Sequence, residues 1–214
     1  MRLQHLLTNI MFILACSWSL AAAASKPVPD SPEGTKPISV GEQLPALTLK
    51  GLDAKPVDLN ALVAKKPTIL IFYRGSWCPY CNTHLGELQT VEAELQKLGY
   101  QVVAVSPDLP NNLETSVEKN ELTYTLLSDS EVKAAQALGL AFRVDDSTYK
   151  LYMNYDINLE EASGEKHHIL PIPAAIVLDT NGKVRFIFSS PDYKVRVDKD
   201  VLLKEAKAAL KAKK

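Results

Sequence analysis

The sequence is poor in cysteine, and neither sign of charge predominates in it. Its 214 residues carry 24 basic and 25 acidic side chains, which gives a net charge of −1 and no basic stripe. A balanced charge of this kind gives no indication of nucleic-acid binding. No glycine-rich cofactor-binding motif is present, so we expect no cofactor, and no internal repeat occurs. The apolar content of 46% and the aromatic content of 7% are ordinary for a globular protein.

The cysteines are Cys16, Cys78 and Cys81, and the last two form a Cys-x-x-Cys pair. If an N-terminal leader is cleaved after Cys16, only this pair remains. A lone pair of this spacing in an exported protein is either a catalytic redox centre or an oxidised staple. A staple across so short a loop stabilises little, because the entropy that it removes from the unfolded chain grows with loop length. The spacing therefore favours the catalytic interpretation.

The N-terminal segment has the pattern of a secretory signal peptide. Arg2 carries positive charge, residues 6–20 are mostly apolar, and Ala21–Ser25 offers small residues for cleavage. We therefore predict a signal peptide over residues 1–24 and an exported protein, located in a bacterial periplasm.

Two alternatives to simple cleavage remain at this end of the chain. A retained membrane anchor would need a longer uninterrupted apolar run than Thr8 and Asn9 allow. Residues Ile13–Cys16 also resemble a bacterial lipobox, in which a lipidated Cys16 would become the mature N-terminus. In that case the protein would carry a membrane tether.

The folded domain is predicted to begin near Gly41. Residues Lys26–Lys36 are rich in proline and contain almost nothing apolar, so they offer little to bury. We expect residues 25–40 to form a flexible leader. Residues 41–214 then have the size of one α/β domain.

The stretch Ile69–Cys81 joins a predicted strand to a predicted helix. Residues Thr68–Tyr73 are apolar, β-branched and aromatic, and the run ends at Gly75, which is typical of a buried strand. Beyond the cysteines, apolar residues recur at steps of three and four until Gly99, as in an amphipathic helix that ends at a glycine. The sequence thus predicts a strand that delivers two thiols to the start of a helix.

The register of this helix start predicts the chemistry of the pair. Pro79 favours the first helical position, which makes Cys78 the N-cap and places Cys81 in the first turn. A thiolate at the N-cap can accept the free N–H groups of the first turn, so we expect the pKa of Cys78 to be lowered. Cys78 is then the expected nucleophile, and Cys81 lies close enough to close a disulfide.

The rest of the chain alternates strand and helix signals. A tight Asn-Gly turn at residues 181–182 joins the last two strands. The predicted strands cover residues 47–49, 57–59, 100–106, 125–127, 174–178 and 184–188. The predicted helices cover residues 111–120, 130–138 and 200–210, while residues 150–155 are ambiguous.

The residues around the two cysteines resemble the motifs of two protein families. Cys78-Pro79-Tyr80-Cys81 is the tetrapeptide of glutaredoxins and has thioredoxin spacing, while Phe72-Tyr73 followed by Cys81 is similar to the peroxiredoxin signature. The chain as a whole resembles the alkyl hydroperoxide reductase/thiol-specific antioxidant superfamily. This resemblance implies an α/β, thioredoxin-like fold with a mixed central sheet flanked by helices. It also implies a peroxiredoxin-type N-terminal hairpin over residues 41–59 and a middle insertion over residues 111–155.

The same resemblance implies roles for residues around the thiols. Pro173 stands where thioredoxin-like proteins place a cis-proline, although it could simply shape the entry to a strand. It also stands where similar peroxiredoxins have an arginine. Arg74 could supply a charge near the thiols or be a solvated loop residue, and Trp77 could shield the pair or be ordinary packing.

Histidines offer two further interpretations. His84 lies one helical step after Cys81 and could assist proton transfer, or it could be a surface residue. His167 and His168 precede the proline loop, so one of them could join the two thiolates in a copper or zinc site. Because nothing else in the sequence supports a metal site, we predict none.

These observations predict a thiol-based antioxidant oxidoreductase that reduces hydroperoxides through Cys78 and Cys81. An external thiol reductant, such as a thioredoxin-like protein, would restore the dithiol. The alternatives are disulfide exchange on protein substrates, started by Cys78, and metal delivery. In the peroxiredoxin register Cys81 attacks the peroxide and Cys78 resolves the product, so the two resemblances assign the attacking sulfur differently.

Overall fold

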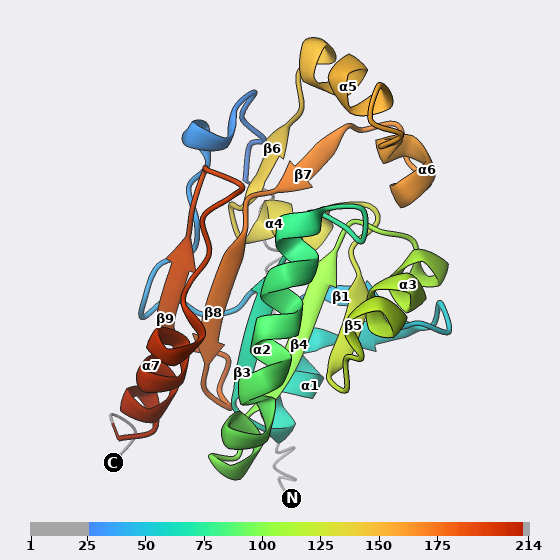
Figure 1. The fold of residues 1–214 in the computed structure, drawn as a ribbon. Helices are drawn as coiled ribbons and strands as arrows, with labels where there is room; N and C mark the ends of the chain where they lie inside the picture. The colour runs from blue at the N-terminus through green and yellow to red at the C-terminus, as the bar shows by residue number, and fades with distance from the viewer. Residues whose placement is uncertain (1–25, 212–214) are drawn as a thin grey trace, which may run out of the picture.

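The computed structural model of the protein describes residues 26–211 (Figure 1). The predicted signal peptide over residues 1–24, including Cys16, lies outside the described residues. Within the described part, no helix is both long enough and apolar enough to cross a membrane.

A seven-stranded mixed sheet runs through the domain in the order β2-β1-β5-β4-β3-β8-β9. Its strands are β1 (Thr48–Lys50), β2 (Pro56–Asp58), β3 (Thr68–Phe72), β4 (Gln101–Ser106), β5 (Thr125–Ser128), β8 (Ala174–Leu178) and β9 (Val184–Ser189). Strand β3 is parallel to β4 and antiparallel to β8, and Leu70 lies opposite both Val103 and Ile176. The strand that leads to the cysteines is therefore interior to the sheet, and all five of its residues are buried.

Helices cover both faces of this sheet (Figure 1). One face packs against α2 (Pro79–Lys97), α3 (Pro110–Asn120) and α7 (Lys199–Lys211), and the other against α1 (Leu59–Lys65) and α4 (Lys133–Ala137). Side chains of β3 alternate between the two cores: Ile69 and Ile71 face the α2 side, while Leu70 and Phe72 face the opposite side. This alternation follows from the two-residue repeat of a strand. Both thiols belong to the α2 core.

The predicted order of strands and helices is confirmed, with ends that move by no more than three residues. The Asn-Gly turn is also confirmed, since Gly182 has φ +76° and its N–H donates to the Asp179 carbonyl at 2.9 Å. The ambiguous stretch over residues 150–155 belongs largely to helix α5 (Asp146–Met153). Asp145 caps this helix by accepting hydrogen bonds from the N–H groups of Ser147 and Thr148.

The expectation of a flexible leader over residues 25–40 is wrong for its described part. The Ile38 N–H donates to the Leu138 carbonyl at 2.8 Å, and the Ile38 side chain is only 5% exposed. The Pro29 carbonyl accepts from the Arg143 N–H at 2.8 Å. Backbone hydrogen bonds and one buried apolar side chain hold the segment on the domain, and its prolines already restrict its unfolded conformations.

The expected middle insertion over residues 111–155 is divided in the structure. Helix α3 and strand β5 belong to the main layers, whereas β6 (Ala141–Arg143) pairs with β7 (Ile169–Pro171) in a separate two-stranded sheet. Between these two strands lie α5 and α6 (Leu159–Ser163), which form the upper part of Figure 1. The insertion therefore extends beyond the expected end, and it places α5 near the start of α2.

Candidate active site

The two cysteines lie where β3 ends and α2 begins. Pro79 is the first residue of α2 and Cys78 is its N-cap, as predicted. The Cys78 carbonyl accepts hydrogen bonds from the Cys81 N–H at 3.0 Å and the Asn82 N–H at 3.1 Å, while the Cys78 side chain makes no capping bond. Both cysteines are free thiols, and each is at most 1% exposed. The site is thus a buried dithiol at a helix N-terminus.

The two thiols ionise in the order opposite to the one predicted. The pKa of Cys78 is raised by its hydrogen bond to Cys81, by burial and by the negative charge of the Cys81 thiolate. Burial alone would also raise the pKa of Cys81, but the Cys78 thiol, the charge of Arg196 and the backbone N–H of Arg74 together lower it to about 6. The expectation of an acidic Cys78 is therefore wrong, because its sulfur donates to its neighbour instead of accepting from the helix.

Arg74 is a buried cation beside the pair, not a solvated loop residue. It is 3% exposed, and its guanidinium donates a short hydrogen bond to the Tyr152 hydroxyl. The guanidinium carbon lies 4.9 Å from the ring centroid of Trp77, 5.5 Å from that of Tyr152 and 4.5 Å from that of Tyr193. The negative faces of the three rings attract the cation. The charge of Arg74 also lowers the pKa of Cys78, although the Cys81 interactions outweigh it.

Arg196 contacts the site from a distant part of the chain, and no motif in the sequence indicates this contact. Its Nη2 lies 3.3 Å from the Cys81 sulfur and donates to it. The other terminal nitrogen donates to the carbonyls of Tyr193 and Val195 in the same loop. Val197, the next residue, is buried in the same apolar core as the thiols. The guanidinium is thus held in place from its own loop.

Asp108 is a second buried group that the sequence analysis missed. One of its carboxylate oxygens accepts from the Ser76 N–H at 2.7 Å and from the Ser106 hydroxyl at 3.1 Å, while the other has no hydrogen-bond partner among residues 26–211. Burial raises the pKa of Asp108 to about 6, and the negative charge of Cys81 also raises it. The motif Ser-Pro-Asp, which begins with the last residue of β4, was a possible signal, since residues at the carboxyl ends of parallel strands gather at one edge of a sheet.

His84 is buried, at 4% exposure, so the interpretation as a surface histidine is wrong. Burial and the charge of Arg196 lower its pKa to about 4. The imidazole is therefore neutral at physiological pH. It lies on the same helix as Cys81 and near Arg196, and as a neutral group it neither repels that arginine nor adds a second cation beside the thiolate.

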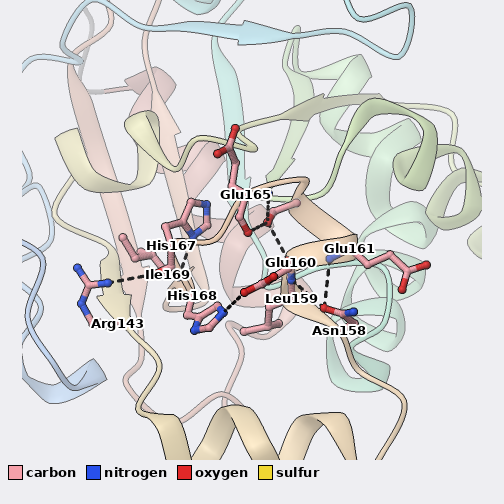
Figure 2. A network of polar contacts seen from close by, with 10 residues as sticks. Arg143, Asn158, Leu159, Glu160, Glu161, Glu165, His167, His168 and Ile169 are labelled. Atoms are coloured by element: carbon pink, nitrogen blue, oxygen red, sulfur yellow. Dashed lines mark hydrogen bonds and ion pairs between the residues drawn. The ribbon is translucent and has the colours of Figure 1, made fainter.

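His167 and His168 make hydrogen bonds to neighbouring residues (Figure 2). His167 Nε2 donates to the Ser130 carbonyl and His167 Nδ1 accepts from the Ile169 N–H, both at 2.9 Å. His168 contacts a carboxylate oxygen of Glu160 at 2.9 Å and stacks on the Tyr149 ring. Among residues 26–211, no three histidine, cysteine or acidic side chains are grouped so that they could hold a metal ion. The alternative of a metal site built from the thiolates and one of these histidines is not assembled.

Pro173 and Trp77 border the site from the insertion side. No peptide bond in the described residues is cis, so the expectation of a cis bond before Pro173 is wrong. Pro173 instead lies where the chain passes from β7 to β8, and its carbonyl accepts from the Ser190 N–H at 3.2 Å. It also lines a cavity of about 230 Å³ beside Arg74. The Trp77 ring packs against Tyr152 with centroids 5.8 Å apart, so it covers Arg74.

The fold and this site define a protein of thioredoxin-like fold that carries a buried two-cysteine centre. The model of the AhpC/TSA family matches residues 40–187. The chain belongs to the AhpC/TSA family, and the resemblance stated from its motifs is thereby confirmed.

Individual relatives agree with this membership. The chain is 39% identical over 104 residues to the putative peroxiredoxin Bcp of Haemophilus influenzae, a match that covers 49% of this chain and 66% of that protein. It is 27% identical over 169 residues to the peroxiredoxin Bcp of Escherichia coli, which covers 78% of this chain and 94% of that protein. The crystal structure of the peroxidoxin BcpB from Mycobacterium tuberculosis superposes with a TM-score of 0.62 at 21% identity, over 83% of this chain and 99% of that one. This structural likeness concerns the fold.

Proposed function

We propose that the protein is a thiol peroxidase in which Cys81 attacks the hydroperoxide and Cys78 resolves the product. The observation that carries this proposal is the donor at Cys81: the Arg196 Nη2 donates to its sulfur at 3.3 Å, whereas the Cys78 side chain makes no capping bond to the first turn of α2. A pKa of about 6 leaves Cys81 mostly thiolate at pH 7, while Cys78 keeps its proton. Membership in the AhpC/TSA family and relatives named as peroxiredoxins support the same activity.

The reaction follows from the two protonation states. The Cys81 thiolate attacks one peroxide oxygen, the O–O bond breaks, and the departing oxygen takes a proton to leave as an alcohol or water. Sulfur is oxidised to a sulfenic acid and the peroxide is reduced. The Cys78 thiol then attacks the sulfenic sulfur, a disulfide forms and water leaves. An external dithiol, such as a thioredoxin-like protein, returns two electrons and two protons.

Disulfide exchange started by Cys78 is the second candidate, and the geometry favours it less. That reaction needs a reactive, accessible Cys78 thiolate. Both cysteines are at most 1% exposed, which hinders contact with a protein disulfide, and the pKa of Cys78 is raised, so its thiolate is scarce at neutral pH. Cys81 is the better nucleophile of the two.

The test compares the two reactions on the same purified, reduced protein. One assay follows hydroperoxide consumption with a recycling dithiol, and the other follows reduction of insulin disulfides. We expect peroxide consumption well above that of the Cys81→Ser variant and insulin reduction near the background rate. Fast insulin reduction without peroxide consumption would replace the peroxidase with the disulfide oxidoreductase.

We also propose that the protein is exported and that residues 1–24 are removed as a signal peptide. The support is the charge and apolar pattern of the N-terminal segment. N-terminal analysis of protein recovered from cells is expected to begin at Ala24 or Ser25, or at an acylated Cys16 if the lipobox is used. A cytoplasmic protein that retains Met1 would contradict export in both forms.

A further inference from the structure

A cavity of about 230 Å³ lies beside Arg74, and three separate parts of the chain form its walls. These parts are the segment before β1, the insertion and the loop after β9, and they contribute the apolar or aromatic side chains of Pro32, Phe142, Tyr152, Pro191 and Tyr193. Sites for small molecules are mostly lined in this way, and those for drug-sized ligands have roughly 300–1,000 Å³. The cavity therefore suits a smaller molecule.

Arg74 brings a buried positive charge to the wall of this cavity. None of the ion pairs among residues 26–211 includes it, and its Nε has no hydrogen-bond partner in that part of the chain. The cation that donates to the Cys81 sulfur is Arg196, so the Arg74 guanidinium remains available. A buried charge without a counter-ion costs free energy, even when aromatic rings pack on it as they do here. An anion in the cavity would supply the missing counter-charge.

The two carboxylates that line the cavity have partners of their own. The Asp30 carboxylate lies 3.9 Å from Arg143 Nε, and its side chain is 96% exposed. The Asp145 carboxylate accepts hydrogen bonds from the first N–H groups of α5. Arg143 also lines the cavity and adds a second positive charge. Arg74 is thus the buried charge that a bound molecule would meet.

We propose that this cavity binds a small aliphatic molecule through its carboxylate, which forms an ion pair with Arg74. A carboxylate matches the planar donor set of a guanidinium and carries a single charge, whereas the carboxylates of Asp30 and Asp145 would repel a dianion. The apolar walls suit an aliphatic remainder.

The position of the cavity connects this ligand with the thiols. Arg74 itself donates to Cys81 through its backbone N–H, and the loop that carries Pro191 and Tyr193 also carries Arg196. A hydroperoxide with a carboxylate at its other end is therefore one source of the bound group, a step that rests on the proposed peroxidase function. A free organic acid is the other source.

The first experiment measures binding to the purified, reduced protein without any peroxide. Isothermal titration calorimetry compares 4-methylpentanoate with 4-methylpentanamide, which has nearly the same shape and no charge. The variants are Arg74→Met, Arg74→Lys and the control Lys194→Gln. Lys194 follows Tyr193 in the loop but does not line the cavity. Circular dichroism and a thermal melt check that each variant folds.

We expect the acid to bind about 10- to 100-fold more tightly than the amide, the usual effect of hydrogen bonds to a charged group. Arg74→Met should bring this ratio to about one, because the buried charge is gone. Arg74→Lys should keep part of it, since it keeps the charge and loses the planar donor set. Lys194→Gln should leave the ratio unchanged.

The second experiment distinguishes the two sources of the carboxylate. It measures kcat/KM for the hydroperoxide 4-hydroperoxy-4-methylpentanoate and for its methyl ester. If the carboxylate belongs to the substrate, the acid should have a kcat/KM about tenfold above that of the ester, and 4-methylpentanoate should inhibit competitively. If acid and ester are consumed equally while 4-methylpentanoate still binds through Arg74, the bound group comes from a separate organic acid. Both results support the site.

Equal affinities for the acid and the amide in the unmutated protein would overturn the proposal, and this comparison does not depend on the folding of any variant. So would a preference for the acid that survives in Arg74→Met, or one that Lys194→Gln abolishes, since either would indicate another site or a general effect of charge. A protein that consumes no peroxide, yet binds the acid through Arg74, would contradict the peroxidase and support the carboxylate site.

Discussion

The strand–helix segment over residues 68–97 and the loop over residues 190–198 contribute to one site in different ways. The first segment places both sulfurs at the N-terminus of α2 through local rules, with Pro79 in the first turn and Cys78 at the N-cap. The second places Arg196 on Cys81 and the Tyr193 ring on Arg74.

The position of the two cysteines and their relative reactivity therefore have different structural origins. Both cysteines belong to the same helix end, so its dipole cannot explain why one pKa is raised and the other lowered. The hydrogen bond between the sulfurs and the cation from the distant loop distinguish them. A Cys-x-x-Cys motif therefore locates a dithiol, and the surroundings decide which sulfur reacts.

The largest expected effect comes from replacing each of the two cysteines by serine in a separate variant. With a sulfenic-acid trap and substoichiometric hydroperoxide, Cys78→Ser should label rapidly, because the Cys81 thiolate remains. Cys81→Ser should label no faster than an ordinary free thiol, since Cys78 keeps its proton. Mass spectrometry of the labelled peptide measures both. Fast labelling of Cys78 in the Cys81→Ser variant would contradict this prediction, because the N-terminus of α2 alone would then be enough to activate its N-cap cysteine.

The unmutated protein provides the companion measurement. After mild peroxide treatment we expect a loss of two hydrogens per monomer, as an intramolecular disulfide between Cys78 and Cys81 requires. The short spacing across the first helical turn is the physical reason. Disulfide-linked dimers as the main product would contradict resolution by Cys78.

A second prediction tests how tightly the segment before the cysteines is constrained by its surroundings. Gly75 has φ +149°, and a Cβ there would lie 2.3 Å from the Trp77 ring nitrogen and 2.9 Å from an Asp108 oxygen. Gly75→Ala should lower the free energy of unfolding by about 2 to 5 kcal/mol, through overpacking and backbone strain. Gly99→Ala is the matched control, because Gly99 has φ +89° but open space around its Cβ position. It should cost only about 1 to 2 kcal/mol in urea unfolding. Equal losses would indicate that close packing at Gly75 is unimportant.

A third prediction concerns the buried carboxyl beside the site. Burial raises the pKa of Asp108 to about 6, so the folded state holds this proton more tightly than the unfolded chain does. Its contribution to stability is therefore fully present below pH ~4 and is lost as the pH rises through 6. Between pH 4 and pH 7, the wild type should lose about 1 to 3 kcal/mol of unfolding free energy relative to Asp108→Asn.

Urea unfolding of both proteins at each pH measures this difference, and shared titrating groups that do not interact with Asp108 cancel in it. Asparagine preserves the shape of the side chain and can still accept from the Ser76 N–H. A difference that is constant with pH, or that changes in the opposite direction, would contradict a proton on Asp108 in this range.

The smallest expected effect concerns Tyr152 of the insertion, whose side chain packs over Arg74. Tyr152→Phe removes the hydroxyl that accepts from the Arg74 guanidinium and keeps the ring, so it should cost about 1 kcal/mol of unfolding free energy. Tyr155→Phe is the control, since Tyr155 is 68% exposed near the end of the same helix and should change stability by less than about 0.5 kcal/mol. Thermal melts of both variants measure the difference. Equal values would indicate that the hydroxyl contributes nothing to holding Arg74.

Much of the fold could be predicted because its signals are local. The apolar run of β3, the periodicity of α2 and the Asn-Gly turn between β8 and β9 each depend on residues a few positions apart. The position of Cys78 as N-cap followed from Pro79 for the same reason. Local signals failed for residues 26–40, where backbone hydrogen bonds to the domain hold a segment whose composition indicated flexibility.

The sequence by itself determined that two cysteines start a helix after a buried strand, because one turn of backbone specifies that arrangement. Only the tertiary structure decided which of them is acidic, since Arg196 lies 115 residues from Cys81 and its approach depends on the anchoring of a loop. The burial of His84 and Asp108 was likewise decided by packing between elements distant in sequence. The effect of a charge on a pKa depends on distance in space, so it could not be derived from the order of residues. Helix periodicity depends on residues a few positions apart, so it could be derived from that order.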